Sequence, residues 1–127
     1  MANVVPDSFK TDLLKGTFNF DSSGASTFKL ALYTNISGLT TATTAFTATN
    51  EVSTSGTNYT SGGNTLTNNG VAVASNIAYV DFADLTFSSV TLSAVGALIY
   101  KSSSGNEAVL VLDFGGTRSE EHTSELQ

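Results

Sequence analysis

The spacing of hydrophobic and polar positions changes once along the chain. Near the N-terminus, in "PDSFKTDLLKG", Phe9 and Leu13 lie one helical turn apart, which predicts a short helix at about residues 7–15. Asp7 or Ser8 is expected to cap its first turn. Because so short a helix is not stable alone, we expect it to dock against the rest of the domain.

After this segment the hydrophobic period shortens to two, as in strands. In "STFKLALYTN", Phe28, Leu30 and Leu32 point to one side, which predicts a half-buried strand. Further on, "VGALIY" and "AVLVLDF" flank the turn sequence "KSSSGNE" and predict a hairpin. Because both arms are nearly continuous apolar runs, we expect them to be buried on both faces.

Residues 36–67 are nearly all Thr, Ser, Asn, Gly and Ala. Such low complexity is also typical of disorder. Isolated apolar residues are spaced along the segment, however, and Thr favours extended structure. They are Phe46, Val52, Tyr59 and Leu66. We therefore interpret the segment as a long ordered excursion with one or two weak strands.

The strand pattern as a whole defines the fold class. About seven short strands separated by Gly and Ser turns indicate an all-β fold, a single β-sandwich or jelly-roll-like domain with one short N-terminal helix. We expect this domain to span residues 1–117, since 127 residues leave room for one core. Charged residues make up only 13% of the chain, so hydroxyl and amide groups carry much of its solubility.

Charge and hydropathy narrow the choice of partners. The formal net charge is −6, of which −4 remains when residues 118–127 are left out. An acidic chain with four scattered lysines does not suit nucleic acid or an anionic membrane surface. We see neither a signal peptide nor an apolar stretch near the ~18 residues that span a bilayer, and expect synthesis in a cytoplasm.

The residues that could carry chemistry are few. His122 is the single histidine and the chain has no cysteine, so we expect no catalytic residues, no cofactor and no enzyme activity. Asp81, Asp84 and Asp113 could form a carboxylate pair or a calcium site, although we favour solvation of strand ends. No metal site is therefore predicted.

Tyrosine rings are the remaining candidates for binding. Tyr33, Tyr59, Tyr79 and Tyr100 could stack on a sugar, since each offers flat apolar area with a polar tip. The alternatives are that they edge the core or fill a subunit interface. The chain has no tryptophan, which weakens the sugar-binding interpretation.

Residues 1–116 resemble, in order, a family of small virion proteins of tailed bacteriophages that is common in marine metagenomes. The resemblance runs from "DSFKTDLLKGTFNF" and "STFKLALYTN" through "TATNEVSTSGTNYTSGGNTL" to "GALIY" and "VLDFGG". It implies a structural component of the capsid surface or the tail, made in the host cytoplasm, that assembles with other phage virion subunits and with copies of itself. It implies no catalytic residue.

Three residues are candidates for the resulting interface. Phe9 and Leu13 on the helix are expected to contact another subunit, although the alternative that they cap the domain's own core stays open. Tyr59, with the Thr-rich loop, is the candidate surface for the alternative function, a glycan- or receptor-binding module of a phage particle.

Residues 118–127, "RSEEHTSELQ", differ from everything before them. They resemble the direct translation of a common sequencing-library adapter, whereas members of the phage family continue with a turn and a final strand. We therefore expect a non-native, disordered tail in place of a missing last strand. A missing strand leaves its neighbour with unpaired backbone groups, so we expect a chain less stable than one of native length.

Overall fold

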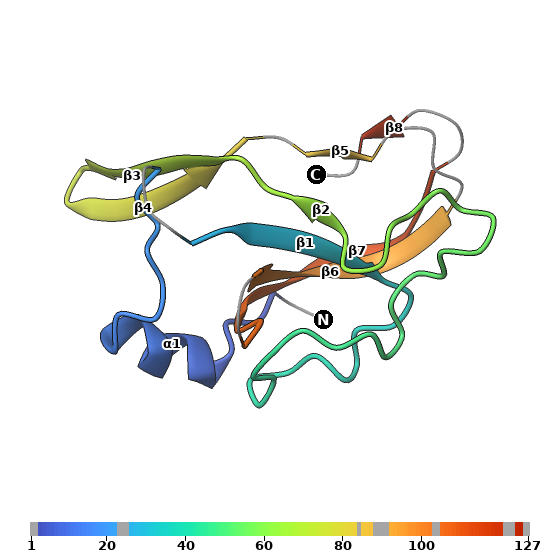
Figure 1. Cartoon of the computed structure of the whole chain (residues 1–127), viewed down its shortest axis with the longest axis horizontal. Helices are drawn as coiled ribbons and strands as arrows, with labels where there is room; N and C mark the ends of the chain where they lie inside the picture. The colour runs from blue at the N-terminus through green and yellow to red at the C-terminus, as the bar shows by residue number, and fades with distance from the viewer. Residues whose placement is uncertain are drawn as a thin grey trace.

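The computed structural model describes residues 3–22, 26–83, 85–87, 92–102, 105–120 and 124–125. These residues form one helix and eight strands (Figure 1). The elements are α1 (Asp7–Leu14), β1 (Phe28–Tyr33), β2 (Asn64–Thr65), β3 (Asn68–Ala74), β4 (Ile77–Phe82), β5 (Thr86–Phe87), β6 (Leu92–Lys101), β7 (Ala108–Glu120) and β8 (Ser124–Glu125).

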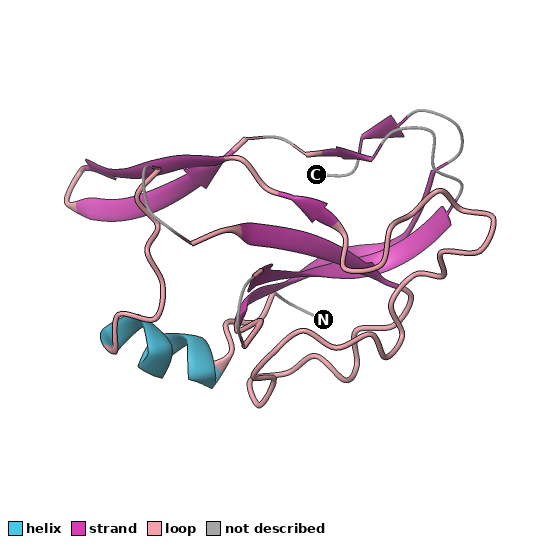
Figure 2. Cartoon of the chain, viewed as in Figure 1, coloured by secondary structure: helices cyan, strands magenta, loops and turns pink. Residues whose placement is uncertain are grey.

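The strands are arranged in one antiparallel sheet and two smaller ribbons (Figure 2). The sheet has the order β2-β1-β6-β7, while β3 pairs with β4 and β5 pairs with β8. The predicted hairpin is β6–β7, which forms the centre and one edge of the sheet. The expectation of an all-β, sandwich-like fold with a single short N-terminal helix is confirmed.

Strand β1 is buried on both faces, not half-buried as its alternation predicts. Phe28, Leu30 and Leu32 do share one side, where they join a cluster with residues of β6 and β7. Ala31 and Tyr33 face a second cluster on the opposite side. The sequence pattern misses this burial because the cover comes from the loop that follows β1, in which Ile36 and Leu39 are buried against the sheet.

The Thr-rich segment is ordered, and its spaced apolar residues serve as anchors. Three of the four are buried, namely Val52, Tyr59 and Leu66. The ring of Phe46 stacks on that of Tyr100, with centroids 4.7 Å apart. The expected weak strands correspond to β2 and to single antiparallel bridges of Tyr33 with Glu51 and of Ala45 with Glu107.

Helix α1 matches the predicted segment, but its capping differs. Pro6, in an extended conformation, occupies the N-cap position, and no side chain caps the first turn. The Ser8 Oγ instead donates to the carbonyl of Thr43 at 3.2 Å, so the expected Asp7 or Ser8 cap is wrong. A tertiary contact has taken the hydroxyl that sequence reasoning assigned to a local bond.

The backbone of residues 118–120 continues β7, contrary to the disordered tail expected from sequence. These residues pair with residues 92–94 of β6, and β8 pairs with β5. Pairing is possible because a ladder needs backbone N–H and C=O groups and no particular side chains. Residues 121–123 and 126–127 lie outside the described residues. That the tail is non-native and that a last strand is missing both stay predictions.

Candidate functional site: an apolar groove

A groove of about 510 Å³ lies between helix α1, the β3–β4 ribbon and the β6–β7 hairpin. Phe9 and Leu13 line it from the helix, and Val71 and Val80 line it from the ribbon. The hairpin contributes Ile99, Val109 and Leu110. Of the described residues that line the groove, none is charged. A surface of this kind suits apolar contact rather than acid–base or metal chemistry.

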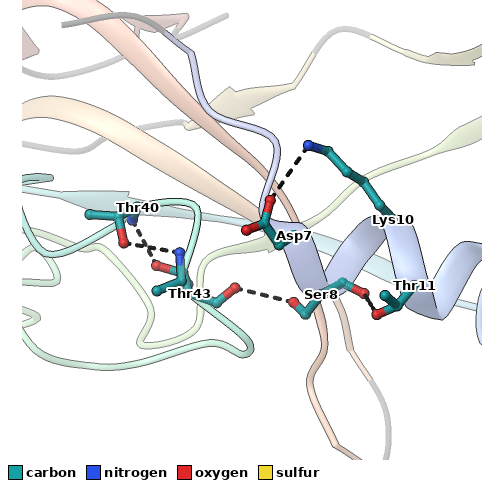
Figure 3. Close-up of polar contacts among 7 residues, drawn as sticks. Asp7, Ser8, Lys10, Thr11, Thr40 and Thr43 are labelled. Atoms are coloured by element: carbon teal, nitrogen blue, oxygen red, sulfur yellow. Dashed lines mark hydrogen bonds and ion pairs between the residues drawn. The ribbon is translucent and has the colours of Figure 1, made fainter.

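The helix wall is fixed at its N-terminal end by the Thr-rich loop (Figure 3). The Asp7 backbone N–H donates to the Thr41 carbonyl at 2.9 Å, beside the bond from Ser8 to Thr43. Thr43 is itself held, because its Oγ1 accepts from the Thr40 backbone N–H at 2.8 Å. The exposed ion pair of Lys10 with Asp7, at 3.5 Å, adds little.

The helix also packs, through Phe9, against a cluster of phenylalanine rings. The ring of Phe9 lies 5.1 Å from that of Phe18 and 6.1 Å from that of Phe20, measured between centroids. Phe20 stacks on Phe28 of β1 at 4.9 Å, and Phe28 meets Phe82 of β4 at 5.6 Å. The two sides of the groove therefore rest on one core, which fixes its shape.

The helix ends with a hydrogen-bonded turn that leaves its last leucines in solvent. Gly16 has φ of 78°, its N–H donates to the Leu13 carbonyl, and the Thr17 N–H donates to the Asp12 carbonyl. This is the Schellman pattern, which the positive φ of a glycine permits. Leu13 is 46% exposed and Leu14 is 89% exposed.

The β3–β4 ribbon exposes apolar side chains on both of its faces. Val71 pairs with Val80, and Val73 with Ala78, on the face that Phe82 continues into the core. The Ala72–Tyr79 and Ala74–Ile77 pairs make the opposite face. The exposed fractions are 57% for Val71, 70% for Val73, 65% for Ile77 and 48% for Tyr79.

Together these side chains make the candidate site, which we call the apolar face and which takes in the rim of the groove and both faces of the ribbon. It comprises Val5, Leu13, Leu14, Val71, Val73, Ile77 and Tyr79. From their exposed fractions, they expose roughly 700 Å² in total, divided between the rim of the groove and the two faces of the ribbon. Exposed apolar surface of this extent on neighbouring elements is typical of an interface.

The structure brings two of the three predicted interface residues to this site. Phe9 packs against the core and Leu13 is half exposed beside it, so both line the groove. Their contact with another subunit stays a prediction. Val71, Val73 and Ile77 were not among the predicted interface residues, because an alternating strand normally buries one of its faces. Tyr79 was a candidate only as one of four tyrosines that could stack on a sugar, edge the core or fill a subunit interface.

Tyr59 is in the core and cannot present a surface. It is 3% exposed, its hydroxyl donates to Glu51 Oε2 at 2.7 Å, and it accepts from the Leu32 N–H at 2.9 Å. Burial raises the pKa of Tyr59, and the hydrogen bond to Glu51 raises it further. The expectation of Tyr59 as an interface residue is therefore wrong, since its ring and hydroxyl are both used inside the domain.

Glu51 fixes the Thr-rich loop through several hydrogen bonds. Its Oε2 also accepts from the Gly62 N–H at 2.7 Å, and its Oε1 accepts from the Ser61 hydroxyl at 3.2 Å. Sequence reasoning missed this role. A signal was present, because Glu51 is the one acidic residue between Asp21 and Asp81.

The other tyrosines divide between core and surface. Tyr100 is 4% exposed and donates to the Gly62 carbonyl at 2.6 Å, while Tyr33 is fully buried and donates to the Thr47 carbonyl. Burial raises the pKa of Tyr33 and of Tyr100, with a smaller contribution from the charge of Glu51. Tyr79 is the exposed tyrosine of the four, so the structure offers no cluster of rings for a sugar.

Asp81 and Asp113, the two candidate carboxylates that the structure describes, are not among the residues that line the groove. Asp81 is exposed and accepts from the Asn69 side-chain amide at 3.2 Å, while Asp84 and His122 fall outside the described residues. Asp113 Oδ1 accepts from the Gly115 N–H at 2.8 Å, and this bond lowers the pKa of Asp113. Within the described part of the chain, no three His, Cys, Asp or Glu side chains gather where they could hold a metal ion.

Comparison with known proteins identifies no relative of this chain. No family model, no curated protein and no solved structure matches the chain. In the part of the chain that the structure describes, no helix has the length and apolar character required to cross a bilayer. The candidate site must therefore be interpreted from its own chemistry.

Proposed function

We propose that this protein is a structural component of a bacteriophage virion, on the capsid or in the tail, and that it acts by protein–protein assembly. The observation that carries the proposal is the apolar face, which leaves roughly 700 Å² of uncharged surface in solvent. An assembly subunit has a use for such a surface, because burying it releases about 25 cal/mol per Å².

Two further observations support assembly rather than catalysis. The groove offers apolar side chains and no charged group among the described residues that line it. The order of motifs from "DSFKTDLLKGTFNF" to "VLDFGG" resembles small phage virion proteins, whose members are particle components. Many weak contacts repeated on a symmetric particle give strong attachment through avidity, so each interface can be modest.

The alternative function, a glycan- or receptor-binding module, has lost its main candidate residue. Tyr59 was expected to present its ring from the Thr-rich loop, but it is buried and hydrogen-bonded to Glu51. We therefore retain assembly as the proposal.

Purified particles provide the test. An antibody raised against the chain would be applied, with gold label, to phage particles purified from a lysate that contains the coding sequence. We expect label at repeated positions on the head or the tail, and peptides of the chain in the purified particle fraction. Peptides found in the lysate but lost from the particles would overturn the proposal.

A further inference from the structure

The apolar face extends well beyond the groove that it borders. Leu14, at 89% exposed, follows the helix wall, and Ile77 lies on the ribbon face that points away from the core side. A small apolar ligand seated in the groove would leave both in solvent. A fatty acid would also find no cation to hold its carboxylate, since no charged side chain is among the described groove residues. The occupant must therefore be large enough to cover the ribbon as well.

The β3–β4 ribbon has the composition of a buried element. Residues 68–80 contain no charged side chain. A two-stranded ribbon is marginally stable at best in water, and a strand pair that carries apolar residues on both faces is normally covered on both. Natural edge strands avoid association through charges, prolines or bulges. The ribbon has one bulge, at its base between Asn68 and Gly70, and its distal part has none of these devices.

The side chains of the ribbon also suit packing against a second ribbon of the same sequence. In three of its four central cross-strand pairs a small alanine faces a large side chain, as in Ala72–Tyr79, Ala74–Ile77 and Val73–Ala78. Large residues of one ribbon can therefore fill the gaps above the alanines of another. Because this part of the chain is uncharged, two copies with a net charge of −6 can meet there without burying like charges.

We propose that the occupant is a second copy of this chain, and that the β3–β4 ribbon of each copy packs into the groove of the other. In this two-fold arrangement each copy gives one ribbon and receives one, so neither groove is complete without the partner. The roughly 700 Å² that each copy offers is close to the ~800 Å² per partner of a standard stable interface. The inference rests on the assembly part of the proposed function and not on a location in the virion.

Charge substitutions on the ribbon test self-association directly. Light scattering coupled to size exclusion, over about 1–100 μM, is expected to give the wild-type chain a mass of twice 13.1 kDa. Val73→Lys and Ile77→Lys each place an ammonium group in the contact and should weaken association about 100-fold. Thr54→Lys, on the exposed part of the Thr-rich loop, is the matched control and should change nothing.

Loss of folding would not be mistaken for loss of association. Val73 and Ile77 are 70% and 65% exposed, so lysine at either position should leave the circular dichroism spectrum of the monomer unchanged. A wild-type chain that is monomeric at about 100 μM would overturn the inference. Lysine variants that are folded and associate as strongly as the wild type would overturn it as well.

Cysteine pairs test which surfaces meet. The chain has no native cysteine, so in an oxidised mixture of the Val73→Cys and Leu13→Cys variants every disulfide joins introduced cysteines, and mass spectrometry of the linked peptides separates the 73–13 link from the 73–73 and 13–13 links. We expect a disulfide-linked heterodimer in that mixture, and none when Thr54→Cys replaces Val73→Cys. Lack of the heterodimer in a sample that still associates would show that another surface is used, and would refute ribbon-in-groove packing.

The two proposals fail separately. A dimer with the predicted cross-link, from a chain that never appears in particles, would keep the self-association and remove the virion role. A chain that is monomeric in solution but found at regular positions on particles would keep the virion role and remove the self-association.

Discussion

Replacing Tyr59 with phenylalanine should destabilise the domain far more than the loss of one surface hydroxyl. On the edge of β1 opposite β6, strand β2 pairs only with Lys29 and Leu30. Beyond β2 on this edge, the Tyr59 hydroxyl accepts the backbone N–H of Leu32 at 2.9 Å. The same hydroxyl donates to Glu51 Oε2 at 2.7 Å. Tyr59→Phe keeps the ring and removes both bonds at once.

The magnitude follows from what is left unpaired. A hydrogen bond to a charged group contributes about 1.5–3 kcal/mol, and a buried donor without a partner costs about 1–3 kcal/mol. Because the two effects share one hydroxyl and do not simply add, we expect a loss of about 2–4 kcal/mol. For a domain of this size that corresponds to a Tm lower by roughly 10 °C.

Urea and thermal unfolding, followed by circular dichroism, measure the loss. Tyr79→Phe is the matched control, because its ring is 48% exposed, and it should change stability by less than about 0.5 kcal/mol. Glu51→Gln tests the other partner of the bond, and the double variant should show a coupling energy of about 1 kcal/mol or more. The reasoning is refuted if Tyr59→Phe and Tyr79→Phe unfold at the same urea concentration.

Three further predictions concern pH, backbone and chain end. Burial raises the pKa of Tyr33, Tyr59 and Tyr100, so the stability they contribute is complete below the unfolded-state pKa of about 10 and is lost above it. Urea midpoints that stay level from pH ~8 to ~11 would contradict this. Gly63→Ala should prevent folding, since its Cβ would lie 1.8 Å from the Leu30 carbonyl oxygen at a φ of +82°, whereas Gly38→Ala, where nothing lies within 4 Å, should fold normally. Removing residues 118–127 should lower the Tm by several degrees, because their backbone pairs with residues 92–94, and an unchanged Tm would favour a disordered tail instead.

The sequence predicted which segments form strands better than it predicted which residues bury those strands. The period-two pattern of Phe28, Leu30 and Leu32 and the apolar arms of the hairpin identified β1, β6 and β7, because the side-chain alternation of a strand is a local property. Burial of the second face of β1 depends on Ile36 and Leu39, which a loop brings back onto the sheet. No local period records that return, so the strand was expected to be half-buried.

The same limit explains the fate of the candidate site residues. Phe9 and Leu13 were found because helical spacing alone places them on one face. Tyr59 was misassigned because a tyrosine among threonines has the same local sequence whether its hydroxyl faces water or a buried carboxylate. Glu51 decides between the two, and its position beside Tyr59 is a product of the fold.

The ribbon poses the opposite problem, because it has the uncharged, apolar composition of a buried element while its structure shows exposure. In "GVAVASNIAYV" the large and small apolar residues alternate on both strands, as they do in a strand with cover on both faces. The single chain provides cover near Phe82, at the base of the ribbon, while Val73 and Ile77 near its tip stay in solvent. A sequence selected for the lone chain would place charges at the tip, as exposed strand edges generally do. The uncharged tip is therefore best explained by a partner, and the open groove beside it has the apolar lining that such a tip would fill.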